Sequence, residues 1–423
     1  MSWPVSQDYN EAIQNPAASF GDAELRAAEP ATNALGLPAP CSGNFADVYH
    51  LRHPDGGSWA VKCFTRSVAG RHERYDEISR HLRRARLPFT IDFVYLEEGI
   101  RVHGRWYPVV KMQWVEGLLL NQFVRDNLTK PALLESLLGL WGRMALRLRE
   151  ADVAHGDLQH GNVLLVPGSR TTHLALKLID YDGMYVPALA GLPAGEAGHP
   201  AYQHPQRRGE KTSGPEVDRV PLLVVAAALR ALTVAGPSLW QRYDNGDNLL
   251  FRQADLRAPG QSALFRQLWR LQDPLTRVLT ARLALACEDP LELAPPLTAL
   301  LTEDLLPVLD PEQKVRAEKL MGTVTYPVGQ PAGAFDFTDS DSAPRPRRRR
   351  RGPTPALIVW AWVGFLALAL AVAVPLILWL TPPADSGREA GAHEPKKGAD
   401  SRRTPAPSGR AKPTPADHDA PDR

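Results

Sequence analysis

Residues 356–380 form a run of twenty-five positions without a charged side chain, ALIVWAWVGFLALALAVAVPLILWL. At about 1.5 Å of rise per residue, a helix of this length exceeds the roughly 30 Å hydrocarbon core of a bilayer. A buried core helix is the alternative, but such helices are usually shorter and contain polar residues. We therefore predict a transmembrane helix at 356–380, with Trp360, Trp362 and Trp379 near the membrane interfaces and a kink at Pro375.

Six arginines stand directly before this run, at position 345 and at 347–351. The positive-inside rule places that flank in the cytoplasm, so residues 1 to about 355 are expected inside and 381–423 outside a cell membrane that the chain crosses once. The whole chain has a net charge of +2, which leaves −4 for everything except these arginines. This balance gives no indication of a nucleic-acid partner. It also leaves the oligomeric state open.

Composition divides the rest of the chain. Residues 321–355 are rich in Pro, Gly, Ser and Asp before the arginines and are expected to form a flexible basic juxtamembrane linker. Residues 381–423 contain no aromatic residue and are expected to be disordered. Residues 1–20 are polar and carry acidic residues, so they are not expected to form a secretory signal. The cysteines number three and lack metal-ligand spacing, so no disulfide framework is expected and a reducing compartment is favoured.

The hydrophobic pattern changes near Gly117. Before it stand short β-type runs, at 45–49, 59–64 and 106–110; after it stand helical patterns, at 132–148 and 222–234. The sequence therefore predicts an α+β domain. A small β-rich N-lobe is expected at 38–117 and a larger helical C-lobe at 118–320, with residues 1–37 as an N-terminal extension that packs on this domain.

Two polar residues precede an apolar run in the stretch AHGDLQHGNVLL, at Asp157 and Asn162. Asp and Asn are common turn residues, because their side chains bond the nearby backbone. The same pair is typical of a phosphoryl-transfer loop, in which the Asp receives a hydroxyl proton and the Asn holds magnesium. Spacing alone does not decide between these interpretations. A second acidic stretch, LIDYDG, places Asp180 after another apolar run.

These motifs, together with the lysine of Ala60-Val61-Lys62, resemble the signature set of eukaryotic-like protein kinases over about residues 41–301. The combination of HGDLQHGN, DYDG and YQHP is similar to divergent bacterial serine/threonine kinases. The resemblance implies a bilobal protein-kinase-like fold that binds ATP with Mg²⁺, with Mn²⁺ as the alternative metal.

The resemblance also implies roles for single residues. Lys62 is expected to hold the α- and β-phosphates and Asp157 to act as the catalytic base, while Asn162 and Asp180 bind the metal. Glu77 is expected to orient Lys62 from the following helix, with Glu73, one turn earlier, as the alternative.

The nucleotide is expected to lie between a glycine-containing hairpin and the linker between the lobes. Only one of the three usual glycines of the hairpin is present. The linker would meet adenine through the Gln113 carbonyl and the Val115 N–H. The residues expected to bind ATP are Gly43, Phe45, Val48, Lys62, Met112, Gln113 and Val115.

Departures from the protein-kinase pattern leave alternatives open. Gly156 stands where a regulatory arginine is usual, so activity is not expected to need activation-loop phosphorylation. The loop also resembles small-molecule phosphotransferases of the same fold, and a pseudokinase scaffold is a further alternative. Residues 198–206 resemble a substrate-docking segment, with Gln206 in place of the usual glutamate. Asp218 resembles the aspartate that braces the catalytic loop. Together they favour a membrane-anchored kinase that acts on serine or threonine hydroxyls of a protein.

Overall fold

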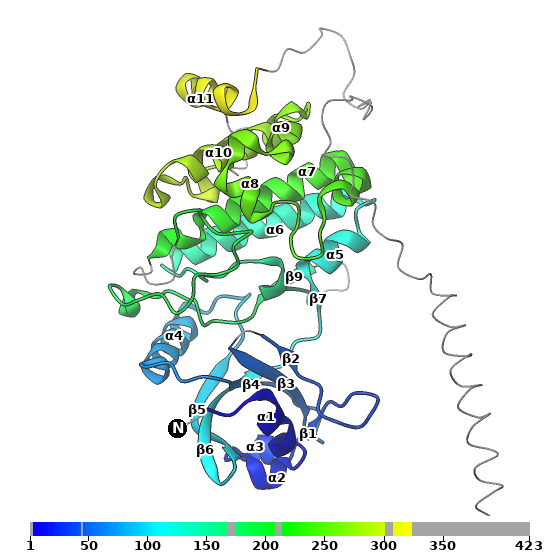
Figure 1. The fold of residues 1–423 in the computed structure, drawn as a ribbon, viewed down its shortest axis with the longest axis vertical. Helices are drawn as coiled ribbons and strands as arrows, with labels where there is room; N and C mark the ends of the chain where they lie inside the picture. The colour runs from blue at the N-terminus through cyan, green and yellow to red at the C-terminus, as the bar shows by residue number, and fades with distance from the viewer. Residues whose placement is uncertain (1–2, 44, 168–173, 208–213, 301–307, 324–423) are drawn as a thin grey trace, which may run out of the picture. The chain divides into compact units, whose positions relative to one another are not determined.

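The computed structural model describes residues 3–43, 45–167, 174–207, 214–300 and 308–323 (Figure 1). These residues all belong to one compact unit. The predicted transmembrane helix at 356–380, the tail at 381–423 and nearly all of the predicted linker lie outside the described residues.

An antiparallel sheet forms the N-terminal part of this unit. Among the described residues it has six strands, in the order β1-β3-β4-β6-β5, and β2 also pairs with β3. The strands are β1 (Glu29–Pro30), β2 (Cys41–Ser42), β3 (Ala46–Arg52), β4 (Ser58–Phe64), β5 (Phe93–Val102) and β6 (Arg105–Gln113). Side chains alternate along β4, so Val61 and Cys63 are fully buried on one face and Lys62 points to the other. The register sets Val48 of β3 opposite Lys62.

Three short helices of the N-terminal segment cover the face of the sheet that holds Val61 and Cys63. They are α1 (Ser6–Ile13), α2 (Pro16–Ser19) and α3 (Ala23–Arg26). An ion pair of 2.7 Å between Asp22 Oδ1 and the buried Lys111 Nζ ties this segment to β6. The carbonyl of Phe64 accepts a hydrogen bond from Tyr9 Oη at 2.6 Å. The segment therefore holds the strand that carries Lys62.

Helix α4 (Arg71–Ala85) follows β4 and packs against β5. Its buried residues are Tyr75, Ile78, Ser79 and Leu82, which recur every three or four positions and so form one face of the helix. This face joins the larger hydrophobic core. The phase of α4 therefore directs Tyr75 inward and decides which of its polar side chains reach the site.

Helices dominate the part after Gly117. They are α5 (Leu120–Asp126), α6 (Pro131–Glu150), α7 (Arg219–Tyr243), α8 (Gln253–Arg257), α9 (Ala263–Arg270), α10 (Pro274–Glu288) and α11 (Pro311–Met321). A small antiparallel sheet of β7 (Leu118–Leu119), β8 (Val163–Pro167) and β9 (Leu174–Leu178) faces the N-terminal part (Figure 1). The indole nitrogen of Trp141 on α6 donates to the Leu222 carbonyl on α7 at 3.0 Å. The sheet-rich and helical parts, and the helices expected at 132–148 and 222–234, are confirmed.

One segment of the described residues, Pro215–Tyr243, is long and apolar enough to cross a membrane by length and composition. Its most apolar window is 61% buried inside the protein. It contains α7, whose side chains from Val220 to Leu232 are almost all buried in the core. A helix that is apolar on all sides suits a protein core as well as a bilayer, and here the core surrounds it.

Candidate active site

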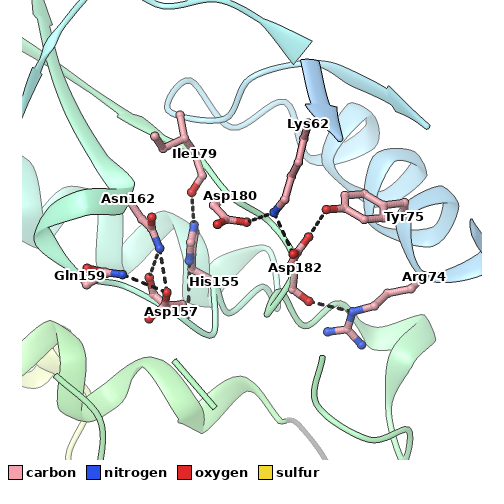
Figure 2. A network of polar contacts seen from close by, with 10 residues as sticks. All are labelled: Lys62, Arg74, Tyr75, His155, Asp157, Gln159, Asn162, Ile179, Asp180 and Asp182. Carbon is pink, nitrogen blue, oxygen red and sulfur yellow. Dashed lines mark hydrogen bonds and ion pairs between the residues drawn. The ribbon is translucent and has the colours of Figure 1, made fainter. Parts of the chain in front are cut away.

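Lys62 joins the two parts of the structure, because its ammonium contacts two carboxylates that follow β9 (Figure 2). Its Nζ lies 2.7 Å from Asp180 Oδ1 and 2.8 Å from Asp182 Oδ2. The Lys62 side chain is only 14% exposed. One buried cation thus fixes the sheet over the loop that starts at Asp180.

Lys62 and its carboxylate partners stabilise one another's charged forms. Burial alone lowers the pKa of Lys62, but the neighbouring Asp180 and Asp182 outweigh it and raise that pKa well above its usual value. Burial likewise raises the pKa of Asp180, and Lys62 outweighs it and lowers that pKa. Lys62 is therefore a cation and Asp180 an anion at neutral pH.

Asp180 also has an uncommon backbone conformation. Its φ is +65°, in the left-handed region that few residues other than glycine adopt. Such conformations persist where the surrounding structure holds them, and they cluster at functional sites. Here the conformation turns the chain so that two carboxylates, at 180 and 182, both meet Lys62.

Asp157 and Asn162 lie in a loop that ends in a 3-10 turn, His160–Asn162, just before β8. The Asn162 amide nitrogen donates to both the backbone carbonyl and Oδ2 of Asp157, each at 2.9 Å. Gln159 Nε2 donates to Asp157 Oδ2 at 3.2 Å, and the His199 backbone N–H donates to Oδ1 at 2.6 Å. The Asp157 carboxylate is thus buried and held at both oxygens, and Figure 2 shows its contacts with Asn162 and Gln159.

Asp218, which directly precedes α7, holds the backbone of this loop. Its carboxylate accepts the backbone N–H groups of His155 and Gly156, the latter at 2.9 Å. Asp218 is buried, and burial raises its pKa although these donors and His155 oppose the rise. The bracing role expected for Asp218 is confirmed by these hydrogen bonds.

Gly156 makes the closest backbone approach in the site. Its φ is +81°, and a Cβ added there would lie 2.0 Å from the carbonyl oxygen of Gly183. Ala154 and Tyr185 pair as a β-bridge on either side of this approach. A side chain at position 156 would clash with the Gly183 carbonyl. The clash explains why this structure has glycine at the position where the kinase pattern has an arginine.

The segment expected to dock a substrate is anchored by buried polar residues. Tyr202 Oη bonds His160 Nδ1 at 2.8 Å, and His204 Nε2 lies 2.8 Å from the Ala286 carbonyl on α10. Gln206 is exposed. The segment is thereby fixed to the loop that holds Asp157 and to the helical core.

A cavity of about 370 Å³ lies between the hairpin and these loops. Its lining residues are Cys41, Ser42, Gly43, Phe45, Ala46, Val48, Lys62, Asp157, Gln159, Gly161, Asn162, Asp180, Asp182 and Glu196. Seven residues predicted from the sequence therefore share one cavity: Gly43, Phe45, Val48, Lys62, Asp157, Asn162 and Asp180.

Val48, predicted to lie over the adenine, lines this cavity, but the linker residues Met112, Gln113 and Val115 do not. Met112 packs against the hydrophobic core, and Gln113, the last residue of β6, is exposed. Between Gln113 and Val115, the Trp114 ring stacks on His50 with centroids 3.9 Å apart. The adenine contacts of Gln113 and Val115, and the place of Met112 at the back of the pocket, stay predictions.

The expected pair between Glu77 and Lys62 is not formed, so this prediction is wrong. Glu77 pairs with Arg80 on the same helix, and its side chain is 31% exposed. Glu73, the alternative, is also exposed. The helix turns Tyr75 toward the site in their place, so Asp182 takes the position next to Lys62 that Glu77 was expected to take.

Sequence reasoning missed Gln159, Asp182 and Glu196, which also line the cavity. Gln159 and Asp182 each stand two positions after a predicted site residue, and that proximity was the available signal. Glu196 lies in the loop before the docking segment, without any motif. Burial, and then the charges of Asp182 and Asp180, raise the pKa of Glu196 to about 8. Near neutral pH Glu196 is therefore mostly protonated and adds little negative charge to the cavity.

Comparisons with known proteins find similar chains among solved structures, one of which is a viral kinase. No family model matches the chain, and no curated protein matches it. Among solved structures it is similar to the kinase PK-1 of Cydia pomonella granulovirus, with 15% sequence identity and a TM-score of 0.36. The match covers 49% of this chain and 70% of the viral one. A similarity of this size does not assign a family, so function rests on the geometry of the site.

The close approach at Gly156 predicts a strong effect of a single methyl group. Gly156→Ala would have to move the Gly183 carbonyl, and should lower the free energy of unfolding by roughly 3 kcal/mol or more. Gly191→Ala is the matched control, because Gly191 has the same φ of +81° and nothing within 4 Å of its Cβ position. It should cost only about 1 kcal/mol, the strain of the left-handed backbone. Equal losses of the two variants in urea unfolding would contradict the steric account.

Proposed function

We propose that this chain is a kinase that transfers the γ-phosphoryl group of ATP to a hydroxyl group of a protein. The observation that carries the proposal is that Lys62, Asp157, Asn162 and Asp180 line one cavity. They come from a strand of the sheet and from two separate loops of the helical part. Phosphoryl transfer needs a cation on the phosphates, oxygen ligands for a metal and a group that orients the acceptor. The cavity holds each of these.

The residues present fit magnesium. Magnesium prefers hard oxygen ligands, and one or two carboxylates with the substrate phosphates usually complete its site. Both hydrogen bonds of the Asn162 side chain use its amide nitrogen, which leaves the amide oxygen for a metal. Asp180 is an anion and would be the second ligand. The bound ion would supply charge stabilisation at the phosphates.

Two further residues act on the reactants. Lys62, which stays protonated beside its carboxylates, neutralises the negative charge of the α- and β-phosphates. The oxygen of the acceptor hydroxyl attacks the γ-phosphorus and ADP leaves, while Asp157 takes the proton of that hydroxyl. Each Asp157 oxygen has two lone pairs, so Oδ1 accepts the His199 N–H and still has room for a hydroxyl donor.

A protein acceptor is favoured by the anchored segment next to Asp157. His199 of that segment bonds Asp157 directly, while Tyr202 and His204 fix the segment to the loop and to α10. A rigid surface beside the base is what a peptide acceptor needs for alignment. Serine or threonine specificity rests on the resemblance of the motifs. A small-molecule acceptor and a pseudokinase scaffold are the outcomes that the assay must separate.

The test is transfer of labelled phosphate from ATP by residues 1–334, with Mg²⁺ or Mn²⁺ and a generic basic protein as acceptor. Asp157→Ala should reduce the rate by about 10²- to 10⁴-fold, the usual contribution of a catalytic base. Asp180→Asn should abolish the metal-dependent transfer. Asp126→Asn, an exposed carboxylate outside the cavity, is the control and should be unchanged.

The outcomes are distinct. Label on protein that vanishes in both site variants supports the proposal. Label found only on added aminoglycoside or choline would make the chain a small-molecule phosphotransferase. Metal-dependent binding of ATP without any transfer would leave the scaffold as the function.

We also propose that residues 356–380 anchor this kinase in the cell membrane, with the described part in the cytoplasm. The uncharged run and the arginines before it support the proposal. After an alkaline carbonate wash, the full chain should stay in the membrane pellet, whereas residues 1–334 should be released. Release of the full chain would contradict the anchor.

A further inference from the structure

Lys62 has two carboxylate partners, and only one of them is assigned to the metal. Asp180 Oδ1 lies 2.7 Å from Nζ, and Asp182 Oδ2 lies 2.8 Å from it. A metal ion at Asp180 competes with Lys62 for the same carboxylate. A second anion is then needed to hold the ammonium in place, and the Asp182 side chain, 16% exposed, is already there.

Asp182 is itself held from α4. The Tyr75 hydroxyl donates to Asp182 Oδ1, so the two oxygens of this carboxylate have different partners, Tyr75 and Lys62 (Figure 2). The Arg74 Nε donates to the Asp182 backbone carbonyl at 3.1 Å, and its Nη2 donates to the Met184 carbonyl at 2.6 Å. Two adjacent residues of α4 thus fix both the side chain and the backbone of Asp182.

The acidic residues of α4 are placed elsewhere. Glu77 pairs with Arg80 along the surface of the helix, and neither of them lines the cavity. Tyr75 is almost fully buried on the inner face, in the same stripe as Ile78 and Leu82. Helix α4 is therefore linked to Lys62 by two successive contacts, from Tyr75 to Asp182 and from Asp182 to Lys62. No glutamate of α4 takes part.

We infer that Asp182 is the positioning residue for Lys62, and that α4 aligns the lysine through Tyr75 and Asp182 so that Asp180 can turn to the metal. The role of Lys62 toward nucleotide phosphates rests on the proposed function. The contact between Lys62 and Asp182 does not, and it can be tested without any nucleotide.

The first measurement is a double-mutant cycle on the full chain in detergent, from urea unfolding of Lys62→Met, Asp182→Asn and the double variant. The coupling between the two sites should be about tenfold in the unfolding equilibrium constant, as for residues in direct polar contact. The matched cycle combines Lys62→Met with Glu77→Gln, which removes an acidic charge from α4. Its coupling should change the unfolding equilibrium constant by less than about twofold.

The second measurement is equilibrium binding of Mg-ATP and of adenosine to the same proteins. Asp182→Asn should weaken Mg-ATP by about tenfold or more, the size of a charged hydrogen bond, and leave adenosine within twofold. Tyr75→Phe keeps the ring packing and should give a smaller loss in the same direction. Glu77→Gln should bind both ligands as the unmodified chain does.

Coupling of Lys62 to Glu77 in place of Asp182 would overturn the inference. So would an Asp182→Asn variant that binds Mg-ATP normally, or one that only raises the Mg²⁺ concentration needed for transfer, since Asp182 would then be a metal ligand. If the unmodified chain binds no nucleotide while the Lys62 and Asp182 coupling is present, the proposed function fails and the positioning of Lys62 stands.

Discussion

The contact of one buried ammonium with two carboxylates organises the whole site. Lys62 and Asp180 are 118 positions apart in the chain, and they belong to the sheet and to the helical part respectively. Withdrawing Lys62 and Asp182 almost entirely, and Asp180 in part, from water is costly, so such a cluster is weak evidence for stability. Its value is geometric. The cluster holds the hairpin above the cavity and sets the distance between the lysine and the loop that carries Asp157.

Backbone constraints hold the other side of the cavity. The loop from His155 to Asn162 is pinned by the buried Asp218, and Gly156 lets it press against Gly183 at the end of the DYDG motif. The two loops therefore meet through glycine backbones, with no space for a side chain at position 156. The N-terminal helices contribute at a distance, since they bond the Phe64 carbonyl two residues beyond Lys62.

Much of the architecture could be predicted from the sequence. Strands with alternating side chains and two long amphipathic or apolar helices appear where their periodicity predicted them, and Lys62, Asp157, Asn162 and Asp180 meet in one cavity. Their motifs are local stretches of sequence, and the resemblance of the whole set to the kinase signature carried the expectation that they meet. The partner of Lys62 was missed because it depends on the rotation of α4. The stripe of Tyr75, Ile78 and Leu82 defines the inner face, and Glu77 is off that stripe. Glu196 had no local pattern, and only the folded loop brings it near Asp182.

Electron paramagnetic resonance of Mn²⁺ can show directly whether Lys62, Asn162 and Asp180 form one nucleotide and metal site. Titration of the protein should show Mn²⁺ bound tightly only when ATP is present, with coupling to phosphorus of the nucleotide. Asp180→Asn should abolish this ATP-dependent binding, and Glu77→Gln should retain it. Mn²⁺ bound equally well without ATP, or equally well by Asp180→Asn, would contradict the account.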